Sequence, residues 1–91
     1  KPRRRPPVDY RELLSPEHFD TFVRLRSLRN QLAEREGTPA YNIFTNQQLA
    51  EMAQLERPSR EALGQIDGVG EKRLEQYAEP FLAALTEGRD G

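Results

Sequence analysis

Apolar side chains recur at three- or four-residue spacing through the first half of this 91-residue chain, and this spacing most constrains its fold. The repeating positions are Phe19, Phe22, Leu25, Leu28 and Leu32. Such spacing is typical of one face of an α-helix, and no segment alternates with period two for long enough to be a strand. Ser15 and Pro16 can cap and begin the helix, and Gly37 can end it. The pattern predicts a helix over residues 16–36.

Two shorter helices are predicted in the middle of the chain. Thr45 can cap the first of them, with Gln48 at the capping-box position, and Pro58 ends it. Ser59 can cap the next helix, which carries an inward-facing Leu63. Both segments are expected to pack an apolar face against the long helix.

The last third of the chain predicts a turn and two more helices. A glycine corner, residues 66–70, is followed by a helix that carries Leu74 and Tyr77. Pro80 would clash with the carbonyl oxygen four residues earlier in a continuous helix, so it predicts the start of a fifth helix. The expected fold class is all-α, a compact five-helix bundle.

Composition restricts the classes of site and of protein. The chain has no cysteine and a single histidine, His18, so thiolate metal sites and histidine-rich metal clusters are not expected. No apolar run approaches a membrane span. Ninety-one residues support one small hydrophobic core. These features predict a cytoplasmic monomer with one helical domain at residues 15–88 and a short tail at residues 89–91.

Charge is distributed unevenly along the chain. Residues 1–14 hold five basic and two acidic residues and are rich in proline, which predicts an extended basic arm or linker. Residues 15–91 hold nine basic and thirteen acidic residues. An acidic domain gains little from nonspecific attraction to phosphates, so any contact with DNA is expected to be weak and local.

Two stretches resemble a known family. These are LRSLRNQLAEREGTPAYNIFTNQQLAEMA at residues 25–53 and LGQIDGVGEKRLEQYAEPFL at residues 63–82. Their Leu-Arg steps, Pro-Ala-Tyr loop and Gly-Val-Gly corner, in this order, resemble the HRDC domain of RecQ-family DNA helicases and of ribonuclease D. The Pro-Ala-Tyr-Asn-Ile-Phe loop favours the RecQ type.

The resemblance implies a five-helix HRDC-like fold and an auxiliary, non-catalytic role in DNA repair and recombination. Such a domain would modulate DNA binding and substrate choice, partly through contacts with other domains of the same helicase. ATP and magnesium would be used by the parent helicase and not by this domain. Two alternatives stay open: an interaction module without nucleic-acid contact, and the RNA-positioning HRDC domain of ribonuclease D.

The resemblance also implies a surface for single-stranded DNA. Arg26 and Arg29 match basic positions of the family, and Tyr41 lies in the matching loop. An aromatic face can stack on any base, and arginine pairs with phosphate. The alternative for Tyr41 is a loop anchor buried under Ile43 and Phe44. The alternative for the two arginines is ordinary solubility and pairing with nearby acids.

The glycine corner is a second candidate contact for DNA. Both of its glycines are expected at positive φ, and backbone amides in such a hairpin can hold a phosphate. Lys72 and Arg73 would add positive charge. Asp67 and Glu71 oppose a phosphate there, so packing of helices is the main expected role of the corner.

The third candidate surface is acidic and consists of Asp67, Glu71, Glu75 and Glu79. Repeated carboxylates on one helix face are usually solvated, and these do not predict a metal site. They would repel DNA and attract a basic surface on another domain. The chain shows no Walker-type glycine loop and no histidine-based triad, so it is not expected to be an enzyme by itself.

Overall fold

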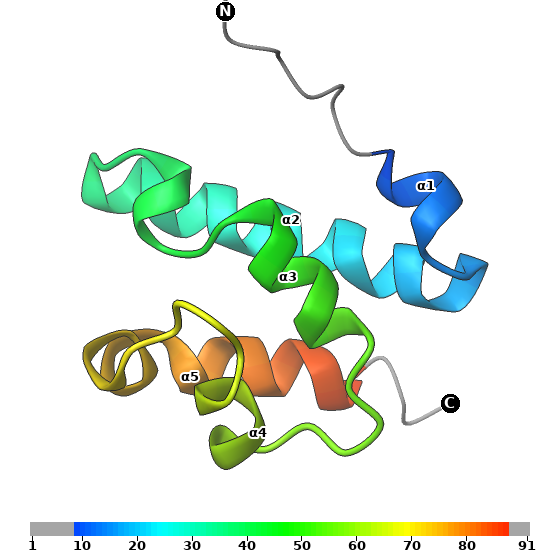
Figure 1. The fold of residues 1–91 in the computed structure, drawn as a ribbon. Coiled ribbons are helices and arrows are strands. Elements are labelled where there is room, and N and C mark those ends of the chain that lie inside the picture. Colours follow the sequence, from blue (N-terminus) through cyan, green and yellow to red (C-terminus); the bar gives the residue numbers. More distant parts are fainter. Residues whose placement is uncertain (1–8, 88–91) are drawn as a thin grey trace, which may run out of the picture.

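The computed structural model of this protein describes residues 9–87, so residues 1–8 of the predicted arm and the predicted tail lie outside the described residues. Within that range the chain forms helices and no strand (Figure 1). The elements are α1 (Tyr10–Leu13), α2 (Pro16–Glu36), the 3₁₀ turn η1 (Ala40–Asn42), α3 (Asn46–Ala53), α4 (Arg60–Gly64) and α5 (Glu71–Glu87). The all-α fold is confirmed.

Local signals place both ends of α2 and the start of α3 as the sequence predicts, whereas α3 ends at Ala53, five residues before the predicted stop at Pro58. The Ser15 hydroxyl accepts a hydrogen bond from the His18 amide at 3.3 Å, and Gly37 ends α2 at a φ of 66°. At α3, the Thr45 hydroxyl accepts from the Gln48 amide while the Gln48 side chain accepts from the Thr45 amide. The predicted capping box is therefore formed on both sides.

Pro80 does not begin a new helix, and this prediction was wrong. Helix α5 continues through the proline. Tyr77 and Phe81, on either side of it, are both buried in the core, and both rings pack edge-on against Phe44. Gln76, whose carbonyl loses its helical partner at the proline, is on the exposed side, where water can replace that bond.

Helix α1 supplies the fifth α-helix instead. Residues 10–13 were predicted to belong to the basic linker, whereas the structure places them in a capped turn in which the Asp9 carboxylate accepts from the Arg11 amide at 3.1 Å. The Tyr10 ring stacks on Phe22 with a centroid separation of 4.8 Å. Leu14, directly after α1, is 5 % exposed and belongs to the core. Four residues are too few to show a helical repeat, so the sequence pattern missed this helix.

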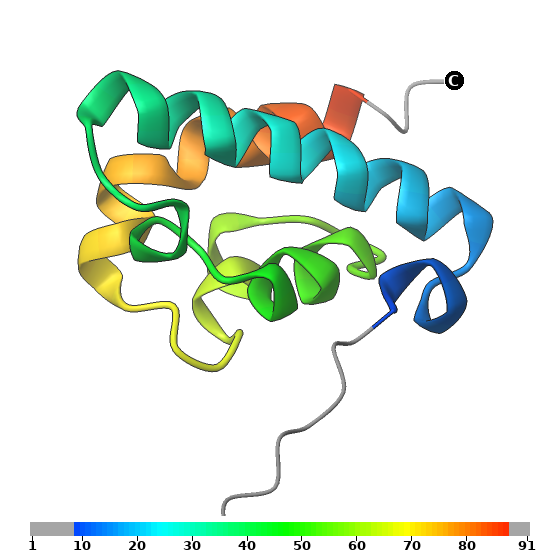
Figure 2. The ribbon, with the colours of Figure 1, turned by 90° about the horizontal axis from the view of Figure 1, so that it is seen from above.

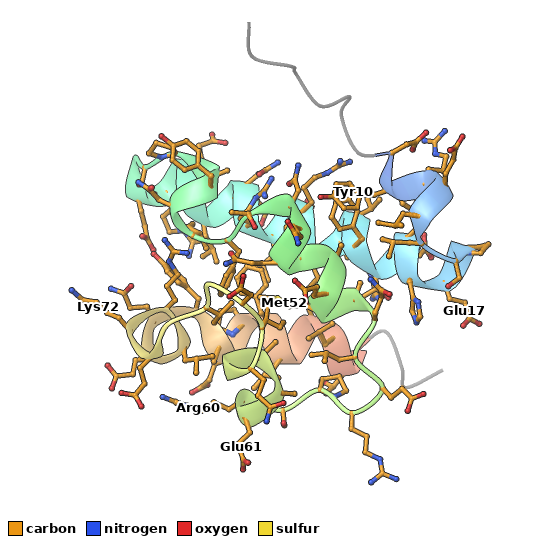
Figure 3. The ribbon with its side chains drawn as sticks, viewed as in Figure 1. Tyr10, Glu17, Met52, Arg60, Glu61 and Lys72 are labelled. Carbon is orange, nitrogen blue, oxygen red and sulfur yellow. The ribbon has the colours of Figure 1, made fainter. Side chains whose placement is uncertain are left out.

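Helices α2 and α5 lie side by side, with α3 and α4 on the other side of the core and α1 at the N-terminal end of α2 (Figures 1 and 2). Phe44 stands at the centre of the core, with its ring edge-on to Phe81 at 4.9 Å and to Tyr77 at 6.1 Å. Met52 fills the space between α3 and α5 (Figure 3). The largest fully buried side chains are Phe22, Phe44, Phe81, Leu25, Ile43, Leu49, Met52, Leu63 and Leu85.

A polar contact joins α5 to the C-terminal end of α2. The Tyr77 hydroxyl donates to a Glu36 carboxylate oxygen at 2.6 Å. This hydrogen bond, together with burial and the charge of Glu36, raises the pKa of Tyr77, and nearby Arg73 offsets part of the effect. The contact holds the end of α2, and with it the start of the following loop, against α5.

Candidate nucleic-acid interface

Arg29, predicted to contact phosphate, lies inside the molecule. Its side chain is 7 % exposed, and four of its five N–H groups donate within the domain. One terminal nitrogen donates to the Phe44 carbonyl at 3.1 Å and to the Asn46 side-chain oxygen at 2.7 Å. The other terminal nitrogen and Nε both donate to the Asn30 side-chain oxygen. Arg29 therefore positions the loop before α3 and is not part of the exposed surface.

Arg29 also has a charged neighbour on its own helix. Burial, together with repulsion from Arg26, lowers the pKa of Arg29. An arginine keeps its charge despite such a shift, because its ordinary pKa is so high. A buried cation is therefore stabilised by three oxygen acceptors, of which the Phe44 carbonyl and Asn46 belong to the loop and the start of α3.

Arg26, one helical turn before Arg29, is exposed. The centre of its guanidinium lies 5.4 Å from the centroid of the Phe22 ring, a cation–π arrangement that restrains the side chain on the surface of α2. Of the two arginines on this face, Arg26 is therefore the one available to a phosphate.

Tyr41 is displayed on the surface. It belongs to η1, which packs on α2, and the side chain is 66 % exposed. The alternative of a buried anchor does not describe Tyr41, because Ile43 and Phe44, both fully buried, hold the loop instead. A large aromatic group exposed to this extent in an anchored loop can offer a face for stacking.

The glycine corner is organised for packing. Gly68 has a φ of 86°, as predicted, but Gly70 does not have the positive φ that was expected of it. The Val69 amide donates to the Ile66 carbonyl at 3.1 Å, and the Gln48 side chain donates to the Asp67 carbonyl at the same distance. The corner is thus tied to α3.

Lys72 and Arg73, the basic residues after the glycine corner, do not lie in one surface patch with Arg26. Lys72 is exposed and points outward at the start of α5, at the end of the domain away from Tyr10 (Figure 3). Arg73 is half-buried and close enough to Tyr77 to affect its pKa. In contrast, all four members of the acidic surface are exposed: Asp67, Glu71, Glu75 and Glu79.

The structure also forms a surface that the sequence pattern missed, here called the α1–α2 groove. It is a hollow of about 320 Å³ lined by Asp9, Tyr10, Arg11, Phe19, Phe22, Arg26 and Asn46. Arg11 mirrors the arrangement of Arg26, because its guanidinium centre lies 5.4 Å from the centroid of the Phe19 ring. The sequence feature that could have indicated this surface is Tyr10 and Arg11, shortly before the capping Ser15. Both residues were predicted to belong to the linker.

Other kinds of site find no support in the described part of the chain. Among residues 9–87 there is no group of three or more side chains of the metal-binding types placed to hold an ion. None of the helices in that range combines the length and the apolar character needed to cross a bilayer.

Comparison with known proteins now identifies the family. The HRDC domain family matches residues 18–85. The chain is 44 % identical over 68 residues to an ATP-dependent DNA helicase RecQ of Haemophilus influenzae and 41 % identical over 66 residues to that of Pasteurella multocida. These matches cover 75 % and 72 % of this chain but 11 % and 10 % of the relatives. An ATP-dependent DNA helicase UvrD2 of Mycobacterium bovis is 36 % identical over 70 residues, which is 77 % of this chain and 10 % of that protein.

The fold and the matched residues define an accessory domain that is helical throughout the part of the chain the structure describes. The chain belongs to the HRDC domain family, in the form that RecQ helicases carry. It spans about a tenth of the length of the curated relatives it matches. No solved structure matches it significantly.

Proposed function

We propose that this domain modulates DNA binding and substrate choice of a RecQ-type helicase through a weak contact with single-stranded DNA. The observation that supports the proposal best is the 66 % exposure of Tyr41 in a loop that is anchored by the fully buried Ile43 and Phe44. The buried Arg29 holds the loop at Phe44 and Asn46, and η1 packs on α2. The ring is thus displayed on a rigid support, which lowers the entropic cost of binding.

Tyr41 and Arg26 have complementary roles in this contact. Tyr41 stacks on a base, and Arg26, held on Phe22, pairs with a phosphate. Lys72 and Arg73 add charge at the start of α5. The acidic character of the remaining domain keeps the affinity in the nonspecific range, with a Kd of about 10⁻⁴ to 10⁻⁶ M at physiological salt.

Substitution of Tyr41 by alanine should weaken binding of an oligothymidylate by about five- to tenfold, because one stacking contact is lost. Fluorescence anisotropy of a labelled strand at low salt measures this. The Tm should stay within a few degrees, since the ring is mostly exposed.

Tyr41→Phe is the matched control, because it keeps the aromatic face and removes only the hydroxyl. Its affinity should stay close to that of the unmodified chain. Equal losses in both variants would assign the contact to the hydroxyl and not to stacking of the ring. No loss in either variant would assign the contact to another residue.

A second contact, between domains, is favoured by the exposure of the whole acidic surface. We propose that Glu71 and Glu75 on α5 face a basic surface elsewhere in the parent helicase. Charge reversal of both to lysine should change the affinity or substrate preference of the full-length enzyme by about three- to tenfold. The same change at Glu61, exposed on α4 and pointing outward (Figure 3), is the control.

In that experiment, an unchanged full-length enzyme would remove the interdomain contact from the proposal. If the isolated domain alone gained DNA affinity from the two lysines, the effect would be one of general charge and not of contact between domains.

The wider setting follows from the relatives. We propose that the parent is a bacterial ATP-dependent DNA helicase that works in DNA repair and recombination in the cytoplasm, at the nucleoid. ATP and magnesium would be bound by its catalytic domains, and this domain would act without a cofactor and as a monomer. The similarity to UvrD2 makes a second helicase class a candidate parent, which favours a helicase over ribonuclease D.

A further inference from the structure

We propose that the α1–α2 groove is a second phosphate-binding site for single-stranded DNA, with Arg11 and Arg26 as its two cationic sides. The inference rests on the proposed function and extends it, because it assigns part of the strand contact to α1. The Tyr41 loop and the groove would be two contacts along one face of α2.

The groove presents two arginines with the same support. Arg11 lies over Phe19 and Arg26 lies over Phe22, each at 5.4 Å from guanidinium centre to ring centroid. The two rings are themselves neighbours, at 6.1 Å. A guanidinium over a ring keeps N–H groups for an oxygen acceptor, and the ring limits its motion. Both arginines are exposed, and no side-chain hydrogen bond or ion pair within the described residues occupies them.

The remaining lining completes a polar site of nucleotide size. Asn46 adds a side-chain amide, and its oxygen is already an acceptor for Arg29, which orients the amide nitrogen as a free donor. The negative charge of Asp9 repels an anion, although one of its carboxylate oxygens already accepts a hydrogen bond from the Arg11 amide. A hollow of about 320 Å³ is near the lower end of the size of small-ligand pockets, which suits one nucleotide of a flexible strand.

The groove and the Tyr41 loop both lie along α2. Helix α1 covers the N-terminal end of α2 and η1 covers the C-terminal half (Figure 1). Arg26 and Asn46 lie between them, and the chain from η1 to Asn46 crosses the face of α2 that carries Arg29. A strand stacked on Tyr41 can therefore continue past Arg26 into the groove. Tyr10 and Arg11 precede the residues matched by the family, 18–85, whereas Phe19, Phe22, Arg26 and Asn46 lie within them.

The experiment measures binding of an oligothymidylate of about 15 nucleotides to the full 91-residue chain over a range of salt concentrations. Each phosphate contact to a single strand contributes about 0.7 to the slope of log K against log salt. Arg11→Ala should lower the slope by about 0.7, and the double variant Arg11→Ala/Arg26→Ala by about 1.4, with about a tenfold weaker affinity at low salt.

The control is the double variant Arg24→Ala/Arg60→Ala, which removes the same charge from exposed positions outside the groove. Its slope should stay within about 0.3 of the original. Amide shift changes on strand binding should include Arg11 and Asn46, and inorganic phosphate at equal concentration should produce smaller ones.

Distinct results separate the two proposals. If the unmodified chain does not bind the strand, the proposed function and the groove both fail. If Tyr41→Ala weakens binding while Arg11→Ala behaves like the control pair, only the groove is wrong. Shifts as large with inorganic phosphate as with the strand would make it a small-anion site and would also overturn the inference.

Discussion

Replacing Arg29 with alanine should lower the free energy of unfolding by about 3 kcal/mol. The change removes four donated hydrogen bonds and leaves the buried Phe44 carbonyl without its side-chain donor. A buried polar group that loses its partner costs about 1–3 kcal/mol, and the space left by the side chain adds to this. For a domain of this size the Tm should fall by about 10–20 °C, which thermal unfolding followed by circular dichroism measures.

Arg24→Ala is the matched control for Arg29, because Arg24 lies on the same helix and is exposed. Its effect should stay within about 0.5 kcal/mol. Arg29→Lys should remain clearly destabilising, because an ammonium group does not reproduce the planar fork that reaches Phe44, Asn46 and Asn30 together. A loss below about 1 kcal/mol for Arg29→Ala would contradict a structural role for this side chain.

Gly68→Ala should destabilise the domain by about 2–3 kcal/mol, for two additive reasons. The φ of 86° is costly for any residue with a side chain, by about 1–2 kcal/mol. A β-carbon there would also lie 2.6 Å from the Gln48 side-chain nitrogen. Gln48 is buried and held by both the capping box and the Asp67 carbonyl, so moving it breaks hydrogen bonds in α3 and in the corner.

Gly37 and Gly70, which also lie in turns, are controls for which smaller losses of stability are expected. At Gly37 the φ is 66° but no atom lies within 4 Å of an added β-carbon, so alanine should cost about 1 kcal/mol. At Gly70 the φ is not positive and the space is open, so alanine should be neutral or stabilising by about 0.4–1 kcal/mol. Urea unfolding of the three variants should rank Gly68 as the most damaging. Equal effects at Gly68 and Gly70 would contradict the packing of the corner on Gln48.

Much of the fold was predictable because its signals are local. The long repeat from Phe19 to Leu32 and the caps at Ser15 and Thr45 depend on neighbours within four residues, and the structure confirms them. Two errors in the predicted helices lie where tertiary contacts outweigh a local rule. Pro80 stays within α5 because buried rings flank it, and α1 persists because Tyr10 stacks on Phe22.

The candidate site was less predictable, as the two arginines of α2 show. Arg26 and Arg29 are one helical turn apart, and the resemblance to the family implied a phosphate contact for both. Only the path of a distant segment distinguishes them, since the chain from Phe44 to Asn46 crosses α2 at Arg29 and leaves Arg26 exposed. In the loop just before this segment, Ile43 is buried and Tyr41 is exposed.

The amino-acid sequence by itself determined the helical class, the family and the main helix boundaries, because periodicity, caps and motifs act over a few residues. Tertiary structure alone decided which side chains face the solvent. It buries Arg29, exposes the ring of Tyr41, and brings Arg11 and Arg26 together in the lining of the α1–α2 groove. Exposure depends on which distant segments pack together, and that packing is settled by the whole core and not by any one stretch of the chain.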